Sequence, residues 1–276
     1  MRTFVVGDVH GRRRQLQAIL NLLPRDVATD TLVLLGDLID RGEDTPGVVA
    51  DVIELISASP EGSVVVLRGN HEQMLLDFLD NESDFWLTHV TGCEPTFEQY
   101  TETSLLTETE DPLPLEVARN LLNKRIPAAH VDLFRRMHMY YEDEFALYVH
   151  AGLDKEGRHP RDIAPERLLW SRSPEFFKSY IGKPCVFGHT PTLLLPLIGR
   201  LGHHGIYMSR SAIGLDTSGP PGAPLSCLSL PDFTLFQSFP AGNVVIRHIT
   251  AFLPEPLRAM KRAAAQRGDK SPATTD

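Results

Sequence analysis

The stretch Gly36-Asp37-Leu38-Ile39-Asp40-Arg41-Gly42 decides the fold of this chain, and it follows the apolar run Thr31-Leu32-Val33-Leu34-Leu35 without a break. A short run of β-branched and leucine residues fits a buried strand better than a helix. The Gly-Asp step that ends the run marks a sharp turn of the chain. We therefore expect a strand over residues 31–35 that carries Asp37 on a loop at its end.

Four further apolar runs end in the same way. Residues 3–6 lead into Gly7-Asp8-Val9-His10-Gly11, residues 63–67 into Arg68-Gly69-Asn70-His71-Glu72, residues 145–149 into His150-Ala151-Gly152, and residues 184–187 into Gly188-His189-Thr190. Each of the five predicted strands thus ends in a side chain that can bind a metal ion. Polar residues at strand ends can converge on one crevice while the sheet holds them rigid. The glycines before Asp8, Asp37, Asn70 and His189 would permit close approach of the backbone.

Length and composition suit a single large domain. The 276 residues are 42% hydrophobic, which suffices for one large core. The net charge of −9 argues against non-specific binding to nucleic acid or anionic membranes, because such surfaces attract Lys and Arg. The three cysteines show no metal-type spacing, which argues against a disulfide framework.

No apolar run approaches the roughly 20 residues of a membrane-spanning helix. Met1-Arg2-Thr3 leads directly into the first strand and leaves no room for a signal peptide. We therefore expect a cytoplasmic protein with neither a nucleic-acid nor a membrane partner, and the sequence leaves its oligomeric state open.

Helical spacing of apolar residues predicts helices after the first three polar loops, over residues 13–23, from 46 to just before 60, and over 72–79. Strands that alternate with helices indicate an α/β layer structure. Residues 81–144 break this alternation as an insert, with helical stretches over 116–123 and 130–139. No Lys or Arg occurs between Arg68 and Arg119, which indicates either a solvated acidic face or an acidic cap that repels anions.

The remaining chain predicts strands over 225–230, 234–239 and 243–249, which suit an antiparallel second sheet. We expect the catalytic domain to span residues 1–253, including the insert at 81–144. Residues 254–276 form a C-terminal tail with a disordered end. His203-His204 is expected in a solvent-facing turn.

The blocks GDVHG, GDLIDRG, GNHE, HAG and GHT, in that order, resemble the phosphoprotein phosphatase family of calcineurin-like metallophosphoesterases. Leu168–Arg172 and Gly214–Ser218 resemble its bacterial branch, and the resemblance covers residues 1 to about 245. It implies an α/β fold of four layers, in which two mixed β-sheets are sandwiched and flanked by α-helices, with a mostly helical insert. The block His150-Ala151-Gly152 differs from the His-Gly-Gly typical of eukaryotic members but retains the histidine.

The resemblance assigns these polar side chains to two metal ions. Asp8, His10 and Asp37 would hold the first ion, and Asp37, Asn70, His150 and His189 the second, with Asp37 shared. Two ions held in this way can bridge an attacking hydroxide and clamp a phosphoryl group. Oxygen and imidazole ligands without thiolates suit manganese, iron or zinc, and we expect manganese to support activity.

Charge also indicates a phosphomonoester substrate. Two divalent ions, offset by the carboxylates of Asp8 and Asp37 and by a bridging hydroxide, leave a net charge of about +1. Arg41 and Arg172 would add guanidinium groups suited to bidentate binding of phosphate. A dianionic phosphate matches this sum.

His71 is the predicted general acid. A serine or threonine leaving group departs as a basic alkoxide, so its protonation assists cleavage. Asp40 lies on a loop that could place its carboxylate against the imidazole and favour the charged ring. The resemblance assigns this pair the same role, and the alternative is that His71 only positions the loop.

The leading interpretation is a metal-dependent phosphatase acting on phosphoserine or phosphothreonine in proteins, or on a small phosphoester. A dinucleoside tetraphosphate hydrolase would use the same ligands and differ around the leaving group, where Trp86, Phe97 and Tyr100 are candidates for stacking on a base. A third interpretation is a phosphate-binding module without catalysis, which the intact His71 and complete ligand set disfavour.

Overall fold

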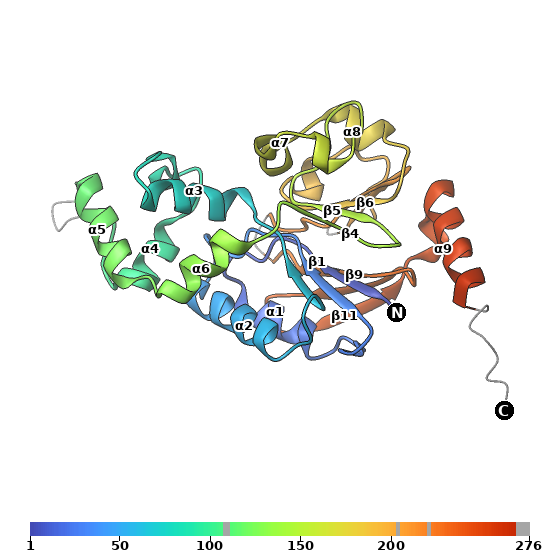
Figure 1. The fold of residues 1–276 in the computed structure, drawn as a ribbon, viewed down its shortest axis with the longest axis horizontal. Helices are drawn as coiled ribbons and strands as arrows, with labels where there is room; N and C mark the ends of the chain where they lie inside the picture. Colours follow the sequence, from blue (N-terminus) through green and yellow to red (C-terminus); the bar gives the residue numbers. More distant parts are fainter. Residues whose placement is uncertain (107–110, 203–204, 220–221, 269–276) are drawn as a thin grey trace.

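The computed structural model describes residues 1–106, 111–202, 205–219 and 222–268, which form two β-sheets flanked by helices (Figure 1). The first sheet has the strand order β11-β10-β9-β1-β2-β3. Its parallel strands are β1 (Thr3–Val6), β2 (Thr31–Leu34) and β3 (Val64–Val66). Its antiparallel strands are β9 (Leu225–Leu230), β10 (Thr234–Ser238) and β11 (Val244–His248).

The pairing of β9 corrects one expectation from the sequence. We predicted that the last three strands form a second sheet, and this is wrong, because β9 pairs along β1, with Val5 opposite Leu228. Both strands are buried along their whole length. Burial of both faces favours a central position in a large sheet over a place in a separate one.

The second sheet has the order β4-β5-β6-β8-β7. Its strands β5 (Leu147–Val149), β6 (Cys185–Phe187) and β8 (Ala212–Gly214) run parallel. The antiparallel strands β4 (Tyr140–Glu142) and β7 (Tyr207–Ser209) flank them at the edges. Both sheets are therefore mixed, as the sequence predicted.

The side chains of β1 show how the sheets pack. Alternate residues of a strand face opposite sides of the sheet. Phe4 and Val6 join the core beneath the first sheet, whereas Val5 joins Tyr148 and Val186 of the second sheet in the core between the sheets. The alternation thus assigns each face of the first sheet to a different core.

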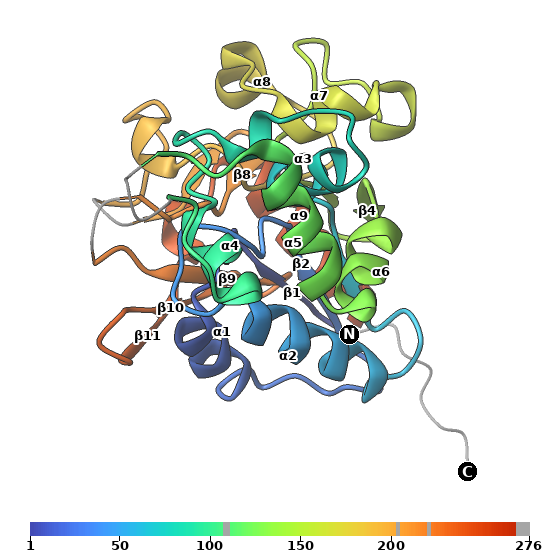
Figure 2. The same ribbon diagram turned by 90° about the vertical axis from the view of Figure 1, so that its left-hand side faces the viewer.

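Helices complete the four predicted layers. In Figures 1 and 2, α1 (Arg13–Leu20) and α2 (Thr45–Ser57) cover the outer side of the first sheet, and α7 (Pro165–Trp170) and α8 (Pro174–Ser179) lie over the second. Asp44 caps α2, because its carboxylate accepts a hydrogen bond of 2.8 Å from the amide of Gly47. The α/β architecture predicted from the sequence is confirmed.

The insert is helical: η1 (Phe85–Leu87), α5 (Leu115–Arg125) and α6 (Ala128–Arg136) pack beside α3 (Asn70–Leu79), and α4 (Glu94–Thr101) packs against α2 and α5. The predicted tail begins with helix α9 (Glu255–Gly268), whose Leu257 is buried in the core between the sheets. The proposed division at residue 253 stays a prediction. The expected turn at residues 203–204 and the expected disordered end at 269–276 lie outside the described residues.

Cys93, Cys185 and Cys227 are free and buried. Within the described ranges, no helix is both long and apolar enough to cross a membrane.

Candidate functional site

The five polar blocks lie at the carboxyl ends of β1, β2, β3, β5 and β6, so they come from both sheets. Two hydrogen bonds join the blocks of one sheet to those of the other. The amide of His189 donates to Asp8 Oδ2 at 2.8 Å, and the Nδ1 of His150 donates to the carbonyl of Leu35 at 2.8 Å. The strand ends of the two sheets therefore converge on one site.

Two of the glycines make this convergence possible. A Cβ atom at Gly69 would overlap Asp37 Oδ1, and one at Gly188 would overlap Asp8 Oδ1. The absent side chains thus let each carboxylate press against the backbone of a neighbouring loop.

Several candidate residues hold a left-handed backbone conformation. The φ angle is 47° at His10, 49° at Asp37, 70° at Asp40, 69° at Arg41 and 62° at His189. Such a conformation costs about 1–3 kcal/mol per residue and persists only where the surrounding structure enforces it. Residues of this kind cluster at functional sites, which agrees with the positions that the sequence selected.

Glu72 ties two of the loops together. Its Oε2 accepts hydrogen bonds from the amides of Asp37 at 3.0 Å and Gly69 at 2.9 Å, and its Oε1 accepts one from Leu38 at 2.6 Å. Burial, followed by the charge of Asp37, raises the pKa of Glu72. This carboxylate fixes the loop after β2 against the first turn of α3.

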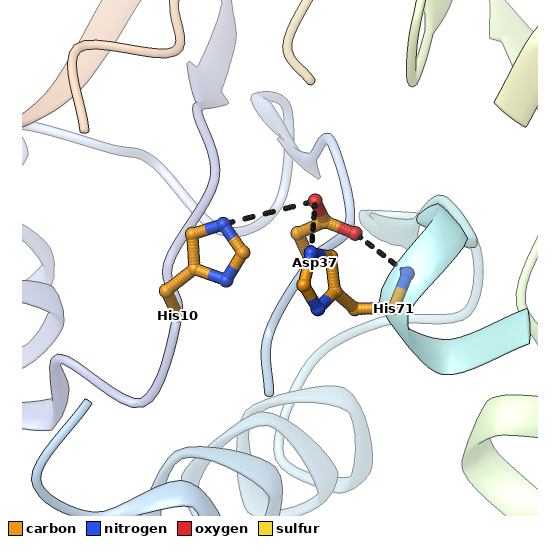
Figure 3. A group of neighbouring side chains, drawn as sticks. All are labelled: His10, Asp37 and His71. Atoms are coloured by element: carbon orange, nitrogen blue, oxygen red, sulfur yellow. Dashed lines mark hydrogen bonds and ion pairs between the residues drawn. The ribbon is translucent and has the colours of Figure 1, made fainter. Parts of the chain in front are cut away.

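The carboxylate of Asp37 faces two neighbouring imidazole rings, those of His10 and His71 (Figure 3). Its Oδ2 is 3.8 Å from His10 Nε2 and 3.9 Å from His71 Nε2, and its Oδ1 accepts a hydrogen bond of 3.1 Å from the amide of His71. All three residues are buried. The backbone contact orients the carboxylate so that its second oxygen faces both rings.

The guanidinium group of Arg41 reaches into this group of residues. Its Nη1 donates to His10 Nε2 at 3.0 Å, and its Nη2 lies 3.1 Å from His71 Nε2. The Nδ1 of His10 donates to the carbonyl of Ile39 at 2.9 Å, which leaves a lone pair on Nε2. A histidine fixed in this way is suited to bind a metal ion through Nε2, and the guanidinium supplies a positive charge at that position.

The other nitrogen of His71 contacts Asp40. Its Nδ1 donates to Asp40 Oδ2 at 2.6 Å, and the indole of Trp86 donates to the same oxygen at 3.1 Å. Burial lowers the pKa of His71, but the charges of Asp37 and Asp40 outweigh it and raise the pKa above its usual value. The predicted pairing of Asp40 with His71 is thus present in the structure.

Acceptor atoms also face one another in a second group. His150 donates through Nδ1, so its Nε2 is the acceptor, and this atom is 3.0 Å from Asn70 Oδ1 and 3.5 Å from Asp37 Oδ1. His189 Nδ1 donates to the same Asn70 oxygen at 2.7 Å, because the Nε2 of this ring accepts from Arg172. The His150 Nε2 and the two oxygens beside it are acceptors, and acceptors at such distances repel one another unless a proton or a cation lies between them.

Asp8 has an unsatisfied oxygen beside these groups. Its Oδ1 is buried and has no hydrogen-bond partner among the described residues. Burial, followed by the charges of Asp216 and Asp37, raises the pKa of Asp8 well above its usual value. A cation near this carboxylate would reverse that effect, because it favours the charged form.

Comparison with known proteins identifies the family. The family model described as calcineurin-like phosphoesterase matches residues 1–206, which is most of the chain. The chain belongs to the calcineurin-like phosphoesterase family.

Curated relatives of this phosphoesterase match it over shorter regions. Serine/threonine-protein phosphatase 1 of Salmonella typhimurium is 41% identical over 85 residues, which are 30% of this chain and 36% of that protein. The symmetrical bis(5'-nucleosyl)-tetraphosphatase of Proteus mirabilis is 42% identical over 76 residues, 28% of this chain and 26% of that protein. The matches thus span about a third or less of these relatives.

Solved structures share the fold over more of the chain. A protein named provisionally as a diadenosine tetraphosphatase aligns with a TM-score of 0.58 and 19% identity, covering 89% of this chain and 92% of that one. A cold-active protein tyrosine phosphatase aligns with a TM-score of 0.51 and 16% identity, and the alignment covers 89% of this chain and 78% of that one. At these identities the likeness concerns the fold.

The donor atoms of this calcineurin-like phosphoesterase fit two metal ions. Within the described chain, two groups of side chains could each hold an ion, and Asp37 belongs to both. The first group is His10, Asp37 and His71, and the second is Asp37, His150 and His189. Asp8, predicted for the first ion, lies outside both groups, so its assignment rests on its unpartnered oxygen and stays a prediction.

A cavity of about 220 Å³ opens over this site. Arg172 lines it and donates through Nε to His189 Nε2 at 3.2 Å. Phe85 and Trp170 form its rim, with ring centroids 6.4 Å apart and exposed fractions of 47% and 41%. The mouth therefore combines a guanidinium group with aromatic surface.

This rim replaces the stacking surface expected from the sequence. Trp86, Phe97 and Tyr100 are buried in the core that the insert shares with the first sheet. Sequence reasoning also missed Glu72, although the residue belongs to a block that was recognised. A carboxylate directly after His71 at the start of a helix was the available signal, since acidic side chains in a first turn often accept backbone hydrogen bonds.

Proposed function

We propose that this phosphoesterase hydrolyses phosphomonoesters in a metal-dependent reaction, with phosphoserine and phosphothreonine in proteins as the preferred substrates. The proposal rests mainly on one observation: buried acceptor atoms of Asp8, Asp37, Asn70 and His150, from four strand ends, converge around Asp37 with too few protons to satisfy them. Two bound cations would satisfy these atoms.

Asp8, His10 and Asp37 would hold one ion, and Asp37, Asn70, His150 and His189 the other. The ions would supply positive charge for the phosphoryl oxygens and a water activated for attack. The hydrogen bonds of His10 and His150 to backbone carbonyls support this assignment, because they hold each Nε2 as an acceptor.

Arg41 and Arg172 bind the phosphate in this proposal. Both are exposed at the opening of the site, and each already donates to a ring nitrogen within it. Guanidinium groups can bind two phosphate oxygens at once, so they orient the phosphate as well as neutralise it.

His71 donates a proton from Nε2 to the leaving oxygen. The hydrogen bond from Nδ1 to Asp40 holds the ring in orientation, and the indole of Trp86 holds the Asp40 carboxylate. An alkoxide leaving group gains most from such an acid, by roughly 10²- to 10⁴-fold.

A dinucleoside tetraphosphate is the second candidate substrate, because the half-exposed rings of Phe85 and Trp170 offer a stacking surface for a base at the mouth of the site. The deciding experiment compares turnover of a phosphoserine peptide, p-nitrophenyl phosphate and diadenosine tetraphosphate with manganese present. We expect the peptide to have the higher kcat/KM of the two natural substrate types. A preference for the dinucleotide that Phe85→Leu abolishes would favour the second candidate, and no turnover of any substrate would favour a phosphate-binding module.

A further inference from the structure

A larger cavity, of about 470 Å³, adjoins the candidate active site. Its lining is largely apolar and includes Phe177 of α8 and Leu194, with Arg172 and Lys178 as its charged members. This volume lies within the range of roughly 300–1,000 Å³ typical of ligand pockets. The cavity is thus large enough for a substrate segment.

This cavity borders the phosphate site. Arg172 lines both cavities, and Thr190 of the second directly follows His189 of the first. The hydroxyl oxygen of Thr190 is buried and has no partner in the described chain. A phosphate held by Arg172 would therefore lie at the junction, and the chain on either side of it could extend over the second cavity.

The wall of the cavity exposes apolar surface to solvent. Leu194, in the short helix η3 (Thr192–Leu194), lines the cavity and is 69% exposed. Exposed apolar surface that lines a cavity often marks a binding site. Lys178 and Arg172 add positive charge beside it, which suits an apolar group carried on an anionic phosphopeptide.

We propose that this cavity binds an aliphatic side chain next to the phosphorylated residue of an extended peptide substrate. The inference rests on the proposed phosphatase function and adds a sequence preference to it. A peptide fits better than a small phosphoester, because only a chain that continues past the phosphate can occupy both cavities at once.

The test uses phosphoserine peptides that differ only in having leucine or serine at one flanking position, with each position examined in turn. At one position we expect roughly a tenfold higher kcat/KM for leucine, the discrimination typical of an apolar pocket. The variant Leu194→Ser should reduce this preference to about threefold or less. Leu197→Ser is the matched control, because Leu197 is an exposed leucine of the same segment but does not line the cavity.

Hydrolysis of p-nitrophenyl phosphate separates this inference from the proposed function, because that substrate is too short to reach the second cavity. Its turnover should be the same in wild type, Leu194→Ser and Leu197→Ser. Normal turnover with no leucine preference at any position would overturn the inference alone, whereas absent turnover in wild type would overturn the proposed function. A preference that Leu197→Ser removes equally would also overturn the cavity as the binding site.

Discussion

Removal of the Glu72 carboxylate should destabilise the protein and displace Asp37. In the wild-type structure, the amides of Asp37, Leu38 and Gly69 donate to Glu72 at 3.0, 2.6 and 2.9 Å. In Glu72→Ala, these three amides lose their acceptors. A buried amide without a partner costs about 1–3 kcal/mol, so three cost about 3–9 kcal/mol. Water that enters the space left by the side chain can accept some of these hydrogen bonds. We therefore expect the free energy of unfolding to fall by about 4 kcal/mol.

Such a loss is a large share of a typical stability of about 5–15 kcal/mol. Glu72→Gln should cost less, about 2–3 kcal/mol, because the amide retains one acceptor oxygen but turns its NH₂ group toward one pair of backbone donors. We therefore predict that Glu72→Ala is the least stable protein, that Glu72→Gln is more stable, and that the wild type is the most stable.

Urea unfolding of protein dialysed against EDTA measures these differences, since ions bound to the native state would add their own stabilisation. Glu61→Ala is the control, because Glu61 is exposed on the surface and should leave the midpoint of unfolding nearly unchanged. If Glu72→Ala lies within about 1 kcal/mol of wild type, the three hydrogen bonds do not hold the loop and the reasoning is refuted.

Three further outcomes test the site and the fold. Asp37→Asn should lower metal occupancy at both positions, whereas Asp8→Asn should mainly empty one; metal analysis of purified variants checks this, and two tightly bound ions in Asp37→Asn would contradict the shared ligand. His71→Asn should reduce hydrolysis of a phosphoserine peptide far more than that of p-nitrophenyl phosphate with metal content unchanged, because only the alkoxide needs an acid; equal losses would falsify the acid role. A hydrogen bond from Lys183 is the largest cause that lowers the pKa of Glu142 from 4.5 to about 2, so its small stabilising effect should be complete above pH 4.5 and disappear toward pH 2. The urea midpoint of wild type should exceed that of Glu142→Gln at neutral pH and converge on it in acid, and a gap that persists at pH 2 would contradict the assignment.

Local sequence pattern determined much of the fold. An apolar run followed by a glycine and a polar residue describes a strand that ends in a functional loop, and each such run that we predicted lies in a strand here. The pairing of His71 with Asp40 was also predictable, because both residues belong to loops whose relative order follows from adjacent parallel strands.

The partners of these elements depended on the tertiary structure. The local sequence of Thr234–Ser238 predicts a strand, β10. No local pattern predicts that its neighbour β9 pairs with β1 and so places both strands in the first sheet. Strand periodicity specifies which face of a strand is apolar and leaves its partner open. The assignment of β9–β11 to the first sheet was therefore beyond reach of the sequence.

The rim of the site shows the same limit at single residues. Phe85 and Trp86 are neighbours in the chain, yet Phe85 is half exposed at the mouth, and Trp86 is buried against Asp40. Phe85 meets Trp170 only because the tertiary structure brings η1 beside the last residue of α7. Composition indicates that an aromatic side chain will pack against something, but the direction in which it points depends on the position of a backbone turn, and packing across the whole domain decides that position.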